Sequence, residues 1–150
     1  MRLLALRGVT ARDIAEVVHS IQSPYFADLA LDECVQSVEA VIDKREVQHA
    51  VITGITLDIM AEKGLLPEPL QGILRADDFL YGVDEVLALA ITNVYGSIGL
   101  TSFGYLDKEK LGILGRLHRK KRGEVHTFLD DLLAGIAAAA AARIAHQRRS

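Results

Sequence analysis

The segment from residue 125 to residue 146, VHTFLDDLLAGIAAAAAARIAH, constrains the fold of this chain more than any other stretch. Alanine has the highest helix propensity, so the alanines at positions 137–142 predict a helix that starts at Thr127 and runs to about Gln147. This helix is apolar almost all round until Arg143. Such a helix belongs either at the centre of a domain or in an interface between copies of the chain.

Apolar residues recur at helical spacing along the rest of the chain, and alternation with a period of two is nowhere sustained. Thr10 and Asp13 have the spacing of a capping box at the start of a helix. Gly104, Gly112 and Gly115 predict short helices and turns in their region. We therefore predict one all-α domain over residues 1–150, a bundle of about six or seven helices.

The charge and composition of the chain argue against several classes of function. A net charge of −3 offers no general surface for nucleic acid, so we expect no nucleic-acid partner. The single cysteine, Cys34, is typical of a reducing compartment, and no signal peptide or membrane-spanning helix is predicted, so we expect a soluble cytoplasmic protein. The basic stretch HRKKRG at 118–123 is either a solvated loop or a surface for peripheral contact with the inner face of a membrane.

Two acidic pairs stand on otherwise apolar helices. Asp84 and Glu85 lie in LYGVDEVLALAI, and Asp130 and Asp131 lie in HTFLDDLLAGIA. If these helices pack together, four carboxylates meet and repel one another unless a cation neutralises them. Mg²⁺ is a hard cation that prefers oxygen ligands, so the pairs predict a magnesium site. The alternative is that each pair only caps its own helix, with Thr127 as the N-cap of the last one.

A third polar group lies between the two pairs in the sequence. Asp107 and Lys110, in YLDKEKLG, are one helical turn apart. They form either a surface ion pair or a phosphate-binding element in which Lys110 holds a phosphate oxygen.

These three groups, in this order, resemble the C-terminal pattern of the phosphatidylglycerophosphatase A family. The matching segments are GVDEVLALAI, YLDKEKLGIL and FLDDLLAGIAA. In the last of them Asp130, Asp131, Ala134 and Gly135 all fall in register with the family pattern. The longer stretches KREVQHAVITGITLDIMAE and NVYGSIGLTSFGYLDK resemble the short soluble branch of that family, often labelled low-temperature-requirement protein C.

The resemblance implies a Mg²⁺-dependent phosphatase that removes the terminal phosphate of phosphatidylglycerol phosphate in phospholipid biosynthesis. It implies that Mg²⁺ is held by Asp84, Glu85, Asp130 and Asp131, and that the phosphate is handled by Asp107, Lys110 and Asp131. The glycine-rich N-terminal signature of the family is missing from this chain. We therefore expect the substrate to be either a phosphorylated small molecule or a lipid headgroup.

Several points of mechanism stay open at the level of sequence. The nucleophile is either a metal-activated water or an aspartate that becomes phosphorylated. His126 is a candidate proton donor and Asn93 a candidate oxygen ligand, and the alternatives are a structural histidine and a hydrogen-bonded core amide. Two other functions compete with the phosphatase: an all-α nucleotide phosphohydrolase, and a non-catalytic homo-oligomer whose acidic pairs only cap helices.

Overall fold

A computed structural model describes residues 2–119 and 123–149 of the chain. Over these two ranges the chain forms nine α-helices and one 3-10 helix, with no strand. The predicted all-α class is confirmed, and the number of helices is larger than the six or seven predicted. The helices are α1 Arg2–Leu6, α2 Ala11–Gln22, α3 Leu31–Ile42, α4 Arg45–Glu62, α5 Leu70–Ala76, α6 Val83–Thr92, η1 Asn93–Tyr95, α7 Ser97–Glu109, α8 Ile113–His118 and α9 Leu129–Arg149.

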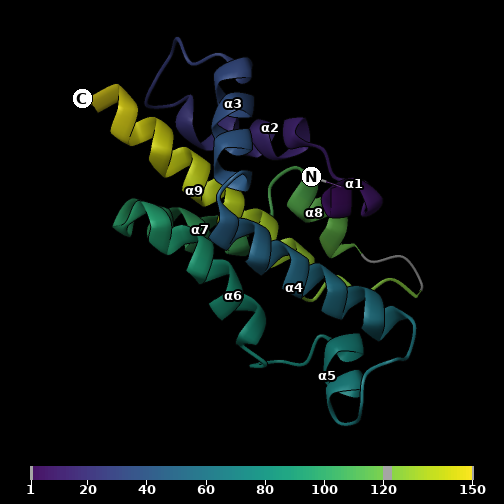
Figure 1. Ribbon diagram of the computed structural model, residues 1–150. Coiled ribbons are helices and arrows are strands. Elements are labelled where there is room, and N and C mark those ends of the chain that lie inside the picture. Colours follow the sequence, from purple (N-terminus) through teal and green to yellow (C-terminus); the bar gives the residue numbers. More distant parts are fainter. Residues whose placement is uncertain (1, 120–122, 150) are drawn as a thin grey trace.

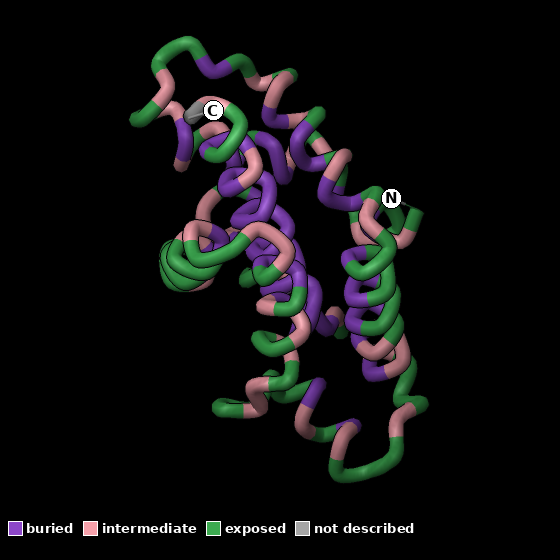
Figure 2. The backbone as a smooth tube through the Cα atoms, turned by 60° about the vertical axis from the view of Figure 1, so that its left-hand side comes forward, coloured by how far each residue is buried: buried purple, intermediate pink, exposed green. Residues whose placement is uncertain are grey.

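Helix α9 forms the centre of the domain. In Figure 1 it runs through the middle of the molecule, with α4, α6 and α7 below it and α1, α2 and α8 above it. Residues 131–142 are all buried, and Figure 2 shows the buried colour concentrated along this central helix. The alanine-rich surface is therefore covered by other helices of the same chain. Of the two positions predicted for this helix, the central one is confirmed.

Two glycines let the neighbouring helices come close to α9. A Cβ atom at Gly54 in α4 would lie 2.7 Å from Leu132 Cδ1, and one at Gly135 in α9 would lie 2.9 Å from the backbone oxygen of Ala88 in α6. Both distances are too short for a real side chain. Gly54 and Gly135 therefore mark the points where α4 and α6 pack directly against α9.

The first turn of α9 is held by Asp58, whose role was not predicted from the sequence. The fully buried carboxylate of Asp58 in α4 accepts hydrogen bonds from the backbone N–H groups of Phe128, at 3.1 Å, and Leu129, at 2.9 Å. The prediction that Thr127 is the N-cap is wrong, because its hydroxyl donates instead to the backbone oxygen of Leu74, at 2.7 Å. The helix consequently begins at Leu129, two residues later than predicted.

Other differences from the predicted elements have local causes. The capping box at Thr10 and Asp13 is confirmed, since the side chain of each residue accepts a hydrogen bond from the backbone N–H of the other. In contrast, α7 continues through Gly104, where the sequence predicts a break. Its first turn packs against the end of α6, where a Cβ at Gly99 would lie 3.0 Å from the backbone oxygen of Thr92. This contact fixes the start of α7, and the helix then continues through the exposed Gly104 despite the low helix propensity of glycine.

Over the described residues, no helix combines the length and the apolar character needed to cross a membrane. The predicted basic stretch at 118–123 contains residues 120–122, which lie outside the described residues.

Candidate active site

A pocket with a volume of about 310 Å³ opens where the first turns of α6 and α9 meet the end of α7 and the loop between α5 and α6. Seven carboxylates line it, against a single lysine and one histidine. The acidic lining residues are Asp77, Asp78, Asp84, Glu85, Asp107, Asp130 and Asp131. An anionic ligand therefore meets strong repulsion in this pocket unless cations accompany it.

The contact between α6 and α9 explains why the two acidic pairs meet. Ala88 touches α9 at Gly135, and Asp84 and Asp131 each lie one helical turn before that contact. The charge of Asp84 consequently acts on Asp131. The Ala-Gly pair that ends the family segment FLDDLLAG thus has a physical role, because only glycine allows this approach.

Lys110 is the positive centre of the pocket. It ends α7 in the left-handed conformation, with φ of 49°. Its Nζ lies 2.7 Å from Asp107 Oδ1, 3.1 Å from Asp130 Oδ2 and 3.9 Å from Asp131 Oδ1. Burial alone would lower the pKa of Lys110, but the carboxylates of Asp130 and Asp107 outweigh it and raise the pKa. The amine is therefore a permanent cation.

The carboxylates behind Lys110 are incompletely neutralised. Asp131 is only 6% exposed, and burial together with the charges of Asp130 and Asp107 raises its pKa far above the ordinary value. Burial also raises the pKa of Asp130, although Lys110 opposes the shift. Burial and the charges of Asp77 and Asp107 raise the pKa of Asp84. One lysine does not balance this set, so the site favours the binding of another cation.

The donor set suits a hard divalent cation by its chemistry, because every donor of the two acidic pairs is a carboxylate oxygen. As the side chains stand, however, no group of three or more His, Cys, Asp or Glu residues within the described ranges is arranged to hold a metal ion. Lys110 instead contacts Asp130 and Asp131 directly. Binding a metal ion would thus require the carboxylates to turn away from the lysine.

The structure separates His126 and Asn93 from this pocket. The Nδ1 atom of His126 lies 3.0 Å from the backbone oxygen of Leu117, and its ring lines another pocket beside Arg7 and Glu124. Asn93 is exposed at the start of η1 and is absent from the acidic lining, so it is not the buried core amide that the sequence suggested. His118, at the end of α8, is the histidine that lines the acidic pocket.

The pocket also has an apolar rim that was not predicted from the sequence. We call Phe79, Leu80, Val83 and Val86 the apolar rim; Phe79 and Leu80 line the pocket itself, and the other two lie on the adjoining turns of α6. Phe79 is 92% exposed and Leu80 is 83% exposed. Leu80 adopts a left-handed conformation, with φ of 64°. Large apolar side chains this exposed beside a polar pocket are a candidate surface for contact with an apolar molecule.

Comparison with known proteins identifies the family. The model of the family described as Phosphatidylglycerophosphatase A matches residues 6–146, which is nearly the whole chain. The chain belongs to the phosphatidylglycerophosphatase A family. The resemblance drawn from the three sequence segments is thereby confirmed.

Relatives and solved structures agree with this assignment. The uncharacterized proteins YutG and YpjQ of Bacillus subtilis (strain 168) are 57% and 56% identical to the chain, over 95% and 96% of its length and over 86% and 81% of theirs. The crystal structure of the low temperature requirement C protein from Listeria monocytogenes is 58% identical, with a TM-score of 0.96 over 98% of this chain and 92% of that one. A protein of unknown function from Bacillus stearothermophilus is 57% identical, with a TM-score of 0.95 over 97% and 91% of the two chains.

Proposed function

We propose that this protein is a Mg²⁺-dependent phosphatase that hydrolyses the phosphate monoester of phosphatidylglycerol phosphate. The observation that carries the proposal is the meeting of all six residues of the family pattern around one pocket. Membership of the family supports phosphatase activity in lipid metabolism. The metal dependence and the specific substrate are our inferences from the chemistry of the pocket.

In this proposal Asp84, Glu85, Asp130 and Asp131 hold Mg²⁺. When bound there, the ion neutralises the charge of the phosphate and lowers the pKa of a water molecule. Helix N-termini carry a partial positive charge, so the first turns of α6 and α9 offset part of the mutual repulsion of these acidic residues. The carboxylates of Asp84 and Asp130 each accept a hydrogen bond from the backbone N–H of the following residue, which helps to fix their orientation.

Lys110 binds and orients the phosphate. Its Nζ already sits among carboxylates on the pocket wall, and Asp107, at 2.7 Å, keeps it fixed and charged. A rigid, permanently charged amine stabilises negative charge that develops on a phosphate oxygen as the ester bond breaks. The side chain therefore exchanges Asp130 for the phosphate when the substrate enters.

The apolar rim favours a lipid over a nucleotide as the substrate. A nucleotide offers a planar base and a ribose, whereas phosphatidylglycerol phosphate offers two acyl chains beside its headgroup. Phe79 and Leu80 are exposed at the mouth of the pocket, where apolar side chains can insert at the boundary of headgroups and acyl chains. We infer a cytoplasmic protein that contacts the inner face of the membrane peripherally through this rim.

We also propose that the protein associates as a homo-oligomer. The alanine-rich face of α9 is covered within the chain, so it is not the surface for association. Exposed apolar residues elsewhere, such as Ile52 on α4 and Leu100 on α7, are the candidates.

Phosphate release from three substrates tests the proposed function. Purified protein with Mg²⁺ is given phosphatidylglycerol phosphate in mixed micelles, an aryl phosphate monoester, and a nucleoside triphosphate. We expect turnover of the phospholipid, weaker turnover of the aryl ester, and loss of both in Asp131→Asn. Asp32→Asn is the matched control, because Asp32 is an exposed first-turn aspartate of α3 outside the pocket.

Two outcomes would overturn the proposal. Turnover of the nucleoside triphosphate alone would show a nucleotide phosphohydrolase. Absence of turnover on every substrate, together with a melting temperature that Mg²⁺ does not change, would show that the acidic residues serve only the fold.

A further inference from the structure

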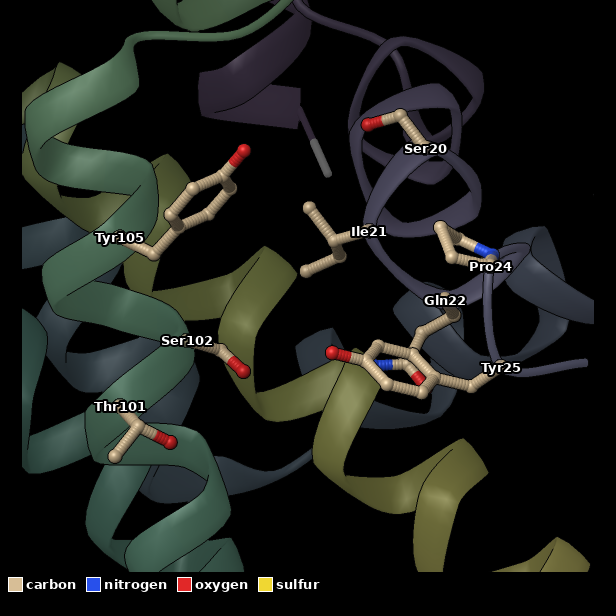
Figure 3. A pocket seen from close by; sticks show the side chains of 8 residues that line it. All are labelled: Ser20, Ile21, Gln22, Pro24, Tyr25, Thr101, Ser102 and Tyr105. Atoms are coloured by element: carbon tan, nitrogen blue, oxygen red, sulfur yellow. The ribbon is translucent and has the colours of Figure 1, made fainter.

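A second pocket, with a volume of about 420 Å³, lies between the end of α2 and the middle of α7. None of the side chains that line it carries a charge. Figure 3 shows Ser102 and Tyr105 extending from α7 toward α2, with Ile21 between the two helices. The lining residues are Ser20, Ile21, Gln22, Pro24, Tyr25, Thr101, Ser102 and Tyr105.

Gln22 distinguishes this pocket from an ordinary surface depression. The residue is only 6% exposed, yet its side-chain amide has no hydrogen-bond partner among the residues that the structure describes. Among the described residues no buried side-chain nitrogen or oxygen lacks a partner, so the amide atoms of Gln22 are in contact with solvent and are open to a ligand in the pocket. The amide carries two donors and one acceptor oxygen, and it lines the pocket.

The hydroxyl groups around Gln22 define what the pocket can bind. Ser20 donates its proton to the backbone oxygen of Val17, at 2.7 Å, and Thr101 donates to that of Ile98, at 3.1 Å. These two oxygens can therefore only accept hydrogen bonds from a ligand. They do not favour an anion, because they have no free proton to donate, and the pocket has no carboxylate to bind a cation.

The remaining polar groups can both donate and accept. The hydroxyls of Tyr25, Ser102 and Tyr105 have no hydrogen-bond partner over the described part of the chain. The tyrosine rings add apolar faces beside their hydroxyls. This lining matches an uncharged molecule with many O–H groups, because each O–H group can both donate and accept a hydrogen bond. The C–H faces of such a molecule can pack against the tyrosine rings.

We propose that the pocket between α2 and α7 binds a neutral polyhydroxylated molecule, a polyol or a sugar, through the Gln22 amide and the hydroxyls of Ser102 and Tyr105. The site is separate from the acidic pocket, and no residue lines both. Both sites share α7, which supplies Tyr105 to this pocket and Asp107 to the other.

Amide chemical shifts of the isotopically labelled full-length protein test this assignment. Glycerol, myo-inositol and glucose are titrated separately, and inorganic phosphate serves as the charged comparison. We expect at least one of the three neutral probes to cause saturable shifts confined to residues 20–25 and 101–105. Gln22→Leu should weaken that binding by about ten-fold or more, because it removes the donors and acceptor and keeps the bulk.

The matched control is Gln36→Leu, on the exposed surface of α3, which should leave the binding unchanged. Ser102→Ala and Tyr105→Phe remove one hydroxyl each and report on the site if Gln22→Leu fails to fold, as judged from its amide spectrum. The proposal is overturned if no neutral probe gives saturable shifts, if the shifts fall on the acidic pocket, or if the folded variants bind as the unaltered protein does.

Discussion

Substitution of Gly135 by alanine tests the packing that brings the two acidic pairs together. Gly135 lies in the second turn of α9, and the backbone oxygen of Ala88 in α6 lies 2.9 Å from the position of the added Cβ. Ordinary contact begins at 3.4 Å, so the two helices must separate by about 0.5 Å. A backbone oxygen in a helix cannot turn aside as a flexible side chain does. Asp84 and Asp131 must therefore move apart with their helices.

The expected magnitude is the sum of two opposed effects. Alanine is more favourable than glycine inside a helix by about 1 kcal/mol. An added methyl group in a packed contact costs about 1–3 kcal/mol. Gly104 in α7 supplies the matched control, because it is exposed and a Cβ there meets nothing within 4 Å. We expect Gly135→Ala to be less stable than Gly104→Ala by about 1–3 kcal/mol, since the helix propensity gain is common to both.

Urea denaturation of both variants measures this difference directly. Gly104→Ala should be more stable than the unaltered protein, with a melting temperature higher by about 2–4 °C. Displacement of the carboxylates in Gly135→Ala should also lower phosphate release by about ten-fold or more. If Gly135→Ala proves as stable as Gly104→Ala and retains its activity, the contact between α6 and α9 does not position the site.

Three further perturbations have defined outcomes. Burial raises the pKa of Asp58 from 3.8 to about 7, so the folded protein binds this proton more tightly than the unfolded chain does. The resulting contribution to the unfolding free energy is fully present below pH 3.8 and is lost as the pH rises through about 7. The unfolding free energy of Asp58→Asn, from urea titrations, should fall less over this pH range than that of the unaltered protein. If the unfolding free energies of the two proteins fall equally with pH, the raised pKa of Asp58 is contradicted. Lys110→Met should lower the unfolding free energy by about 2 kcal/mol without divalent ions, and Mg²⁺ should raise its melting temperature more than that of the unaltered protein. An equal effect of Mg²⁺ on both proteins would show that the lysine and the cation do not compete. Phe79→Ser should change stability by less than about 0.5 kcal/mol and reduce co-sedimentation with phospholipid vesicles, whereas Leu6→Ser, exposed outside the pocket, should leave it unchanged. If Phe79→Ser co-sediments with vesicles as the unaltered protein does, the apolar rim does not contact the membrane.

Much of the fold follows from local sequence signals. The capping box at Thr10, the alanines of α9 and the apolar spacing of α6 are each sufficient to predict a helix. Both acidic pairs stand out on apolar helices, but Asp107 and Lys110 were added to them only by the family resemblance, because the two residues alone fit a surface ion pair as well.

The features that the sequence did not predict depend on contacts between distant residues. Asp58 looks like one polar residue in an amphipathic helix, and its role appears only when α4 packs beside the start of α9. His118 was interpreted as part of a basic stretch, since nothing local shows that α8 turns it toward the acidic pocket. His126 was considered as a proton donor because it is adjacent in sequence to the acidic segment, yet it lies in another pocket. Adjacency along the chain is a weak guide where a helix begins and the direction of each side chain changes.

The most direct test of the central claim is the position of a divalent ion in crystals of the protein. Mn²⁺ prefers the same oxygen ligands as Mg²⁺ and can be located by its anomalous scattering. We predict an anomalous peak between the Asp84–Glu85 and Asp130–Asp131 pairs, with the amine of Lys110 withdrawn from Asp130. Crystals grown with the ion that show no peak there, and that keep Lys110 in contact with Asp130 and Asp107, would contradict a cation as the partner of these carboxylates.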